Sequence, residues 1–454
     1  MRRLFSEVPT DGLETGTGVS IRGGIVLAKF LVKNNGPLQG EVTISGSKNS
    51  VLPIMAAALL SDDTCKILDV PALRDVEVMC QILESVGASV EKNYDEGVIT
   101  IDANHELRNE APSELSKRMR ASILTMGPLL TKFGSAKAAL PGGCAIGARP
   151  IDLHLKGFEA MGAKIEFDDY KGCVTASVDG RLHGARIYLD YPSVGATENI
   201  MSAAVLAEGQ VIMENVAQEP EIVDLANYLN KMGAKVKGAG TDSIKIEGVK
   251  SLHGTEHHVI PDRIETGTFM VAAAITRGNV LVKNVVPDHV RPIIAKLIEC
   301  GCEVEVEEID ETQDGLRVRA EGKELVGTDI KTLPYPGFPT DMQSQFMALL
   351  TTVHGNSTVM ETVFENRFMH INELNHMGAN IRIEGIRAVI PGDTRLKGAE
   401  VVSTDLRAGA ALVLAGLAAE GVTEILEIRH IERGYSDFVE KLKGIGADIR
   451  RVDQ

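Results

Sequence analysis

The stretch AALPGGCAIGARPIDLH, from Ala138 to His154, places a single cysteine, Cys144, beside two glycines and shortly before an Arg-Pro pair. A structural cysteine normally sits in an apolar run, where it packs as a small hydrophobic side chain. Two adjacent glycines leave the backbone free and bury little, so this segment is expected to be a loop. The thiol is then either an ordinary surface group or one placed for acid or nucleophilic chemistry.

The segment GSKNS, which begins at Gly46, contains a lysine but lacks the spacing of a phosphate-binding P-loop. Gly40 lies one residue too early, and Ser47 separates Gly46 from Lys48. The chain has no zincin motif, no GxSxG elbow and no GxGxxG at a strand-to-helix turn. Its cysteines form neither a CxxC pair nor a zinc-like cluster; they are Cys65, Cys80, Cys144, Cys173, Cys300 and Cys302. The sequence therefore predicts no metal and no cofactor.

A short segment containing Gly-Ala or Gly-Cys, followed by a strand-like run, recurs six times along the chain. Each copy follows an amphipathic helical pattern, so its glycine is expected to cap a helix C-terminus. The glycines lie 68 to 77 residues apart, at Gly87, Gly162, Gly233, Gly301, Gly378 and Gly446. A helix, a turn and a strand precede each copy, so every unit is predicted as helix–strand–helix–strand, usually closed by a further strand.

The sixth unit ends one strand short, at ADIRRVDQ, and KFLVKN followed by GEVTISG near the start is expected to supply the missing piece. The chain then crosses between domains near Lys48 and returns near Asp262. We therefore predict an α/β (α+β) protein with three repeat units in each of two domains. Domain I spans residues 48–260 and carries the Cys144 loop, domain II spans 28–47 and 261–454, and residues 1–27 form a flexible N-terminal extension.

Equivalent positions of the units carry cations where helices are predicted to begin. Fourteen residues before the turn glycine of the first helix, or its equivalent, lie Lys48, Arg120 and Arg407; thirteen before the cap glycine lie Arg149 and Arg433. A helix N-terminus is partially positive and favours acidic or hydroxyl side chains. Five cations in register make sense where a phosphate or carboxylate completes the site. The pattern favours an anion site between the domains over a solvated ring of charge.

The amino-acid composition excludes several classes of function. With 454 residues the chain is too long for one core, and its 44% apolar and 24% charged content is typical of a folded protein. A net charge of -16 and 4% aromatic residues argue against nucleic-acid binding. The longest apolar run, Ala408–Ala419, is too short to span a bilayer, and no signal peptide is recognisable. We expect a reduced, cytoplasmic protein without membrane partners.

Several motifs together closely resemble those of the UDP-N-acetylglucosamine 1-carboxyvinyltransferase family. They follow the family's order across Ala28–Val452 and read SGSKNS, RMRASI, LPGGCAIGARPIDLH, SVGATENI, PDRIETGTF, FPTDMQSQF, ETVFENRFMH, TDLRAGAALVLAG and IERGY. The resemblance implies two inside-out α/β domains, each of three βαβαββ-type units, with the active site in the interdomain cleft. It also implies transfer of the enolpyruvyl group of phosphoenolpyruvate to the sugar 3′-hydroxyl, with release of phosphate, as the committed step of peptidoglycan synthesis.

The resemblance assigns catalytic roles residue by residue. Cys144 corresponds to a loop acid that protonates the phosphoenolpyruvate methylene carbon and reacts with the epoxide fosfomycin. Asp341 corresponds to the acid/base residue facing the sugar hydroxyl; on its own, PTDMQ would favour a helix cap. Asn49 corresponds to a residue that hydrogen-bonds substrate near the reacting centre. The cations that hold phosphoenolpyruvate correspond to Lys48, Arg120, Arg407 and Arg433.

The nucleotide-sugar site is implied in the same way. Its residues correspond to Arg120, Arg149, Pro150, Ile151, Asp152, Leu153, Ser193, Val194, Gly195, Asp341 and Val363. Tyr191 stands where some members carry a lysine near the uridyl group and is left out of the site. Supporting or interdomain roles fall to Glu219, Asp262, Arg263 and Glu365.

Two other functions remain open at this stage. A 5-enolpyruvylshikimate-3-phosphate synthase shares the fold and the co-substrate, but its site does not use a cysteine loop like GGCAIGARP. A non-catalytic repeat scaffold that binds nucleotide sugar would not need Cys144, Asp341 and the cations together. The sequence leaves the oligomeric state open, with a monomer compatible with every feature above.

Overall fold

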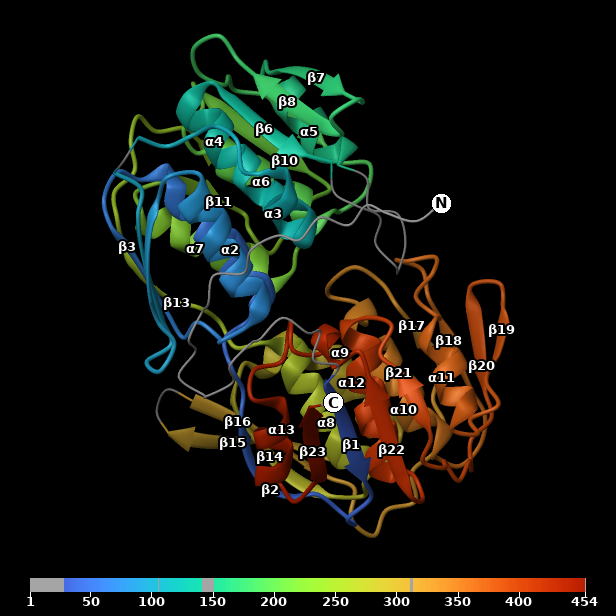
Figure 1. Cartoon of the computed structure of the whole chain (residues 1–454). Coiled ribbons are helices and arrows are strands. Elements are labelled where there is room, and N and C mark those ends of the chain that lie inside the picture. Colours follow the sequence, from blue (N-terminus) through green and yellow to red (C-terminus); the bar gives the residue numbers. More distant parts are fainter. Residues whose placement is uncertain (1–27, 105, 141–150, 311–312, 454) are drawn as a thin grey trace, which may run out of the picture.

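The computed structural model describes residues 28–104, 106–140, 151–310 and 313–453. Figure 1 shows two lobes, and β1 and β2 from the start of the described chain lie in the same lobe as its C-terminal half. Each lobe has its own hydrophobic cluster. One gathers residues between Val51 and Val259, and the other joins Phe30–Ile44 to residues between Ile264 and Ile449.

The first lobe contains three helix–strand–helix–strand–strand units. The first consists of α1 (Lys48–Ala57) with η1 (Ala58–Leu60), β3 (Cys65–Leu68), α2 (Arg74–Ser85), β4 (Ser89–Asn93) and β5 (Val98–Asp102). The second consists of α3 (Ser113–Arg118), η2 (Arg120–Thr125), α4 (Met126–Phe133), β6 (Ser135–Ala139), α5 (Asp152–Ala160), β7 (Lys164–Asp168) and β8 (Cys173–Ser177). The third consists of β9 (Arg186–Tyr188), α6 (Val194–Ala204), β10 (Gln210–Glu214), α7 (Pro220–Lys231), β11 (Lys235–Lys237) and β12 (Ser243–Glu247), and β13 (Glu256–His258) follows.

The second lobe repeats the plan. Its elements begin with β1 (Ala28–Lys33), β2 (Gln39–Thr43), α8 (Arg263–Ile275), β14 (Asn279–Val285), η3 (Pro287–Val290), α9 (Arg291–Glu299), β15 (Glu303–Asp310) and β16 (Gln313–Arg319). The fifth unit comprises β17 (Ile330–Lys331), η4 (Thr340–Met342), α10 (Gln343–Thr351), β18 (Ser357–Met360), α11 (His370–His376), β19 (Arg382–Glu384) and β20 (Arg387–Ile390). The last comprises β21 (Glu400–Val402), α12 (Leu406–Ala418), β22 (Val422–Leu426), η5 (Ile428–His430), α13 (Phe438–Gly444) and β23 (Asp448–Asp453).

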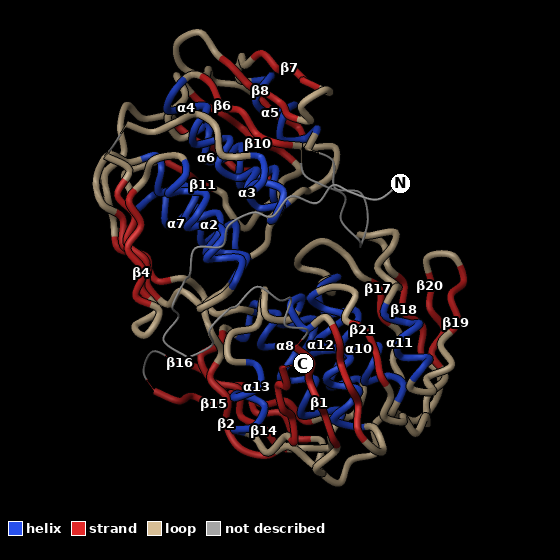
Figure 2. The backbone as a smooth tube through the Cα atoms, viewed as in Figure 1, coloured by secondary structure: helices blue, strands red, loops and turns tan. Residues whose placement is uncertain are grey.

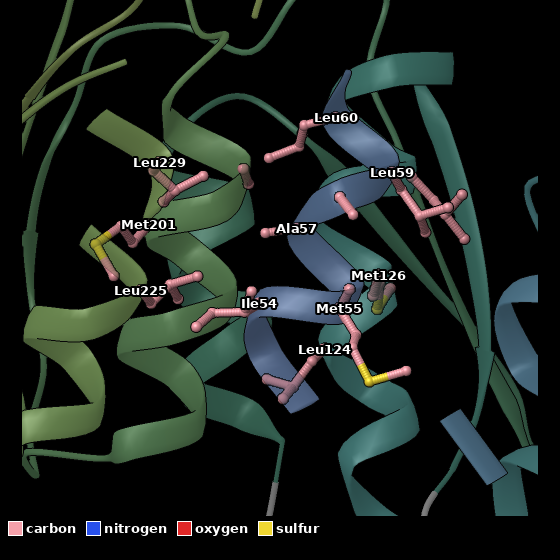
Figure 3. Packing of buried hydrophobic residues seen from close by; sticks show 14 of the residues in the cluster. Ile54, Met55, Ala57, Leu59, Leu60, Leu124, Met126, Met201, Leu225 and Leu229 are labelled. Carbon is pink, nitrogen blue, oxygen red and sulfur yellow. The ribbon is translucent and has the colours of Figure 1, made fainter. Parts of the chain in front are cut away.

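The helices lie inside each lobe and the strands lie toward its outside, as Figure 2 shows. Central helices such as α8 and α12 are buried on nearly every side, which fits this arrangement. In α8 all residues from Ile264 to Ile275 are buried, and in α12 those from Arg407 to Leu417 are. In the first lobe, Ile54 and Ala57 of α1 point toward the helix that carries Leu225 and Leu229 (Figure 3). The predicted inside-out α/β fold is confirmed.

The repeat glycines cap their helices as predicted. All six have φ between +97° and +107°, in the region that favours glycine, and each directly follows the C-cap residue of its unit's second helix. The N-termini of these second helices are less regular than the repeat spacing predicts. Glu365 and Arg433 lie in turns, and the next helices begin only at His370 and Phe438.

The strands near the start of the chain complete two different sheets. β1 inserts between β22 and β23, antiparallel to both, and so supplies the strand that the sixth unit lacks. β2 does not join it there. It pairs in parallel with β14 of the fourth unit, and β13 pairs in parallel with β3 of the first. β2 and β13 are therefore edge strands that run parallel to their neighbours, each in the sheet of the first unit of its lobe.

The chain passes between the lobes through two segments that lie side by side. Ser47 donates its N–H to the Ile260 carbonyl at 2.7 Å, and Asp262 donates to the Ser45 carbonyl at 2.9 Å. Gly46 sits between these bonds, opposite Pro261. A Cβ on Gly46 would lie 1.9 Å from the Asp69 carbonyl oxygen, so only glycine fits at this crossing.

We therefore expect Gly46→Ala to lower the free energy of unfolding by about 1–3 kcal/mol, because a backbone carbonyl must move to admit the methyl group. Gly444→Ala is the matched control, since nothing lies within 4 Å of its added Cβ. Urea unfolding of both variants measures the difference. A Gly46→Ala protein as stable as the Gly444→Ala protein would show that the crossing is not closely packed.

Candidate active site

Lys48 opens α1 immediately after the chain enters the first lobe. Its backbone N–H donates to Asp262 Oδ2 at 3.3 Å, and its Nζ lies 3.4 Å from Asp75 Oδ2. The side chain is only 13% exposed. Burial lowers the pKa of Lys48, Asp75 opposes that shift, and the nearby charges of Arg407 and Arg433 add to it. Cations from both ends of the chain thus lie close enough to repel one another.

Asp75 joins the two lobes. It is the second residue of α2 and is almost fully buried. Its Oδ1 accepts from Arg433 Nε at 2.8 Å and its Oδ2 from Arg433 Nη2 at 3.3 Å, while Oδ2 also faces Lys48. Asp75 does not stand out in the sequence, because an aspartate in a helix's first turn is ordinary. Only the fold brings Arg433 to it.

Asp341 holds a second group of cations in the other lobe. Its Oδ2 accepts from Arg407 Nη2 at 3.1 Å, and its Oδ1 lies 2.8 Å from Arg367 Nη1. Asp341 lies inside the short helix η4 and presents its carboxylate to these guanidinium groups. The guanidinium of Arg407 also lies 5.4 Å from the ring centroid of Tyr435. Arg367 and Tyr435 do not stand out in the sequence alone.

Arg407 is nearly fully buried and retains an unmet hydrogen-bonding group. It is the second residue of α12, where Asp405 caps the helix by accepting from the Arg407 and Ala408 N–H groups. Its Nη1 is buried and has no hydrogen-bond partner among the residues that the structure describes. A buried guanidinium N–H costs free energy unless an acceptor reaches it, so an anionic ligand would satisfy this group.

The starts of α5 and α6 lie side by side in the first lobe. Ile151, Asp152 and Leu153 enter α5 directly, and Ser193 caps α6 by accepting from the Ala196 N–H. A Cβ on Gly195 would lie 3.4 Å from the His154 ring, so the two helix starts touch there. Val194 begins α6. The structure thus brings these predicted residues together.

His154 has a defined tautomer. Asn199 accepts the Gly127 N–H through Oδ1, and its Nδ2 faces both the Ile123 carbonyl at 2.9 Å and His154 Nδ1 at 3.0 Å. The amide therefore donates to Nδ1, which leaves the ring proton on Nε2. Burial, and then the charge of Arg120, lowers the pKa of His154 to about 4. Arg120 opens η2 and lies close to this neutral imidazole.

The predicted supporting residues line the junction of the lobes. Asp262 caps α8, and Arg263 Nε lies 2.9 Å from Glu221 Oε1. Glu219 receives the Tyr335 N–H at 3.5 Å. Burial, and then the charges of Glu219 and Glu361, raises the pKa of Tyr191.

The remaining predicted residues are placed as follows. Asn49 follows Lys48 in α1, and Val363 donates its N–H to Glu361 Oε1 at 2.8 Å. Glu365 lies in the turn that follows Val363. Cys144, Arg149 and Pro150 lie outside the described residues, as do residues 1–27.

Within the described ranges, no group of three or more His, Cys, Asp or Glu residues could hold a metal ion. The helices traced in the same ranges are all too short or too polar to cross a bilayer.

Comparisons with known proteins identify the family of the chain. The family model of EPSP synthase (3-phosphoshikimate 1-carboxyvinyltransferase) matches residues 32–442. UDP-N-acetylglucosamine 1-carboxyvinyltransferase 1 of Caldanaerobacter subterraneus subsp. tengcongensis is 60% identical over 423 residues, which are 93% of this chain and 99% of the relative. UDP-N-acetylglucosamine 1-carboxyvinyltransferase 2 of Carboxydothermus hydrogenoformans is 60% identical over 426 residues, 94% of this chain and 100% of the relative.

Solved structures share the fold at low identity. The enolpyruvyl transferase NikO from Streptomyces tendae has a TM-score of 0.83 at 24% identity, and EPSP synthase from Acinetobacter baumannii has 0.72 at 20%. Each match covers 94% of this chain and 100% of the solved chain. The fold is therefore that of the enolpyruvyl transferases. The chain belongs to the EPSP synthase family and, within it, to the UDP-N-acetylglucosamine 1-carboxyvinyltransferases.

The position of Asp75 leads to a first prediction for the site. Asp75→Asn removes the carboxylate that pairs with Lys48 and Arg433, so inorganic phosphate should bind about tenfold more tightly at low salt. Loss of these charged hydrogen bonds should lower the free energy of unfolding by about 1.5–3 kcal/mol, and phosphate should restore part of it. Calorimetric titration and unfolding measure both effects.

Glu77→Gln is the control for Asp75→Asn, because Glu77 lies on the same helix but pairs with Lys92 at 3.1 Å. Phosphate binding should not change in that variant. Weaker phosphate binding by Asp75→Asn would show that Asp75 supports the anion site and does not compete for its cations.

A second prediction concerns acid stability. The unfolded chain titrates His154 near its ordinary pKa of 6.5, whereas the folded chain holds it at about 4. Between these values the unfolded state binds more protons, so the free energy of unfolding falls as the pH drops from 6.5 to about 4. His154→Gln should flatten this dependence, leaving a smaller slope from His289, His370 and His430, whose pKa values burial also lowers. Equal slopes in urea unfolding of both proteins would contradict the prediction.

Proposed function

We propose that this protein transfers the enolpyruvyl group of phosphoenolpyruvate to the 3′-hydroxyl of UDP-N-acetylglucosamine and releases phosphate. The observation that carries the proposal is the convergence of Lys48, Arg407 and Arg433 on two carboxylates, in a chain 57–60% identical to transferases named for this acceptor. The reaction would serve peptidoglycan synthesis in the cytoplasm.

Lys48, Arg120, Arg407 and Arg433 are proposed to hold phosphoenolpyruvate, with Asn49 beside its reacting end. The substrate carries a phosphate and a carboxylate, so it offers acceptors for several cations at once. Arg407 Nη1 is buried without a partner in the described structure and is suited to one of them. Arg433 and Lys48 would exchange Asp75 for substrate oxygens, so both cations stay paired with negative charge throughout.

Asp341 is the proposed base for the sugar hydroxyl. Before substrate binds, Arg407 and Arg367 share its carboxylate. An anion that binds Arg407 withdraws one of these partners, which makes the carboxylate a better proton acceptor. The hydroxyl oxygen then attacks C2 of phosphoenolpyruvate as its proton passes to Asp341.

Cys144 is the proposed acid in the same step. Its thiol proton goes to the methylene carbon, which becomes a methyl group, and the resulting tetrahedral intermediate keeps its phosphate. The Cys144 thiolate then takes a proton back from the methyl group as phosphate leaves C2, which regenerates both the double bond and the thiol. The cations around Lys48 stabilise the charge that collects on the departing phosphate.

UDP-N-acetylglucosamine is proposed to bind along the starts of α5 and α6. The residues involved are Arg120, Arg149, Pro150, Ile151, Asp152, Leu153, Ser193, Val194 and Gly195, with Asp341 and Val363 on the sugar side. Free N–H groups at two adjacent helix starts suit the diphosphate. Neutral His154 at this position adds no charge, so its Nε2–H acts as a hydrogen-bond donor.

The proposal is tested by phosphate release from phosphoenolpyruvate with UDP-N-acetylglucosamine or shikimate 3-phosphate as acceptor. The second acceptor is included because the matching family model is that of the shikimate enzyme. Phosphate release with the nucleotide sugar alone supports the proposal. Release with shikimate 3-phosphate alone, or with neither acceptor, overturns it.

Asp341→Asn keeps the size of the side chain and removes its basicity, so turnover should fall about 100-fold or more. Asp329→Asn is the control, because this exposed residue accepts the Thr358 N–H at 2.7 Å and an asparagine can do the same. Steady-state turnover rates of both variants test this prediction. Near-normal turnover of Asp341→Asn would show that Asp341 is not the base for the sugar hydroxyl.

The described cysteines provide an internal control for Cys144. All five are buried. Burial raises the pKa of Cys65, that of Cys80 and Cys300 to about 12, and that of Cys302 to about 11. Buried, protonated thiols are poor nucleophiles. Fosfomycin should therefore alkylate Cys144, faster with UDP-N-acetylglucosamine present and slower with phosphate. Peptide mapping that finds the label mainly on another cysteine would contradict this role.

A further inference from the structure

A buried polar group lies behind the first turn of α1 and takes no part in the reaction proposed above. Asp224 of α7 accepts from Ser50 Oγ at 2.5 Å through Oδ2, and its Oδ1 lies 2.8 Å from His257 Nε2. The Ile260 N–H also points to Oδ2, at 3.3 Å. All three side chains are almost completely buried.

This group ties together the two segments that join the lobes. Ser50 lies two residues after Lys48, which opens α1 just past the first crossing. His257 lies in β13, and Ile260 lies in the second crossing, where its carbonyl accepts the Ser47 N–H at 2.7 Å. A single carboxylate therefore contacts both segments at the point where they meet the first lobe.

The group is polar although an apolar side chain could fill the same space. His257 Nδ1 is buried without a hydrogen-bond partner in the described chain, which costs free energy that a leucine or methionine would not. A carboxylate that is buried in this way contributes little net stability to the fold. Its three directed hydrogen bonds do, however, fix the relative positions of α1, α7 and β13.

The second lobe anchors the same crossing in a similar way. Glu265 of α8 accepts the Ser45 N–H at 2.9 Å, and Lys441 Nζ lies 2.6 Å from both Glu265 Oε1 and Ser45 Oγ. The crossing at Gly46 thus lies between one buried anchor in each lobe.

We infer that Asp224 is a positioning residue: through Ser50 and Ile260 it holds the first turn of α1, and so Lys48 and Asn49, in the place where the anionic substrate binds. The inference rests on the proposed function for the identity of that substrate. Asp224 lies behind α1 and does not reach the substrate itself.

The test compares two buried serines of the first lobe. Ser50→Ala removes the hydroxyl that binds Asp224, whereas Ser202→Ala removes one that binds the Glu198 carbonyl at 2.9 Å on α6. Both variants lose one buried hydroxyl from a helix, and Ser50→Ala should lose more stability because its hydroxyl binds a carboxylate. Only Ser50→Ala should raise the KM for phosphoenolpyruvate and the Kd for inorganic phosphate, by about tenfold, as expected for one charged hydrogen bond.

Asp224→Asn should act in the same direction as Ser50→Ala and more strongly, because it disturbs all three bonds. Equal KM and Kd values in the Ser50→Ala and Ser202→Ala proteins would overturn the inference. Phosphate binding is measured without turnover, so the comparison stands even if the wild-type protein does not transfer enolpyruvate. In that case the proposed function fails and the positioning role is judged on phosphate alone.

Discussion

Three cations brought close together in a partly buried place repel one another, and the rest of the site depends on how that repulsion is balanced. Lys48, Arg407 and Arg433 come from α1, from α12 and from the turn before α13. Asp75 pairs with both Lys48 and Arg433, and Asp341 pairs with Arg407, so two carboxylates only partly offset three cations. An incoming phosphate or carboxylate replaces these side chains as the partner of the cations, because it supplies negative charge with more acceptor oxygens.

The fold makes such a balance possible by keeping sheets on the outside and helices inside. α1 and α8 begin directly after the two crossings, and α12 begins at the place where Arg407 contacts Asp341. The two side-by-side crossings hold those helix starts in register across the junction, with Gly46 allowing the close approach. Ion pairs between the lobes, Asp75 with Arg433 and Glu221 with Arg263, complete the connection.

Much of this architecture follows from sequence periodicity. The repeat glycines predict six units because each must adopt the positive φ that ends a helix. The missing strand of the sixth unit predicts the insertion of β1. The pairing of β2 with the fourth unit could not be predicted, because its short alternating pattern fits the edge of any of these sheets.

The candidate site likewise contains residues that the sequence marks and residues that only the structure reveals. Lys48 and Arg407 stand out because a cation at a helix start is unusual, and the family motifs mark Asp341. Asp75 and Arg367 do not stand out, because an aspartate at a helix start and an arginine in a turn are common. Their importance comes from partners hundreds of residues away or on another element, such as Arg433 for Asp75. Contacts of this kind become visible only in three dimensions.

The most direct measurement of the central claim is a double-mutant cycle between Asp75→Asn and Arg433→Gln, with unfolding measured in the absence and presence of saturating phosphoenolpyruvate. A carboxylate that balances the cation until substrate arrives should show a coupling free energy of about 0.5–3 kcal/mol without ligand. That coupling should largely vanish when the substrate is bound. No coupling in the ligand-free protein, or the same coupling in both states, would contradict the account.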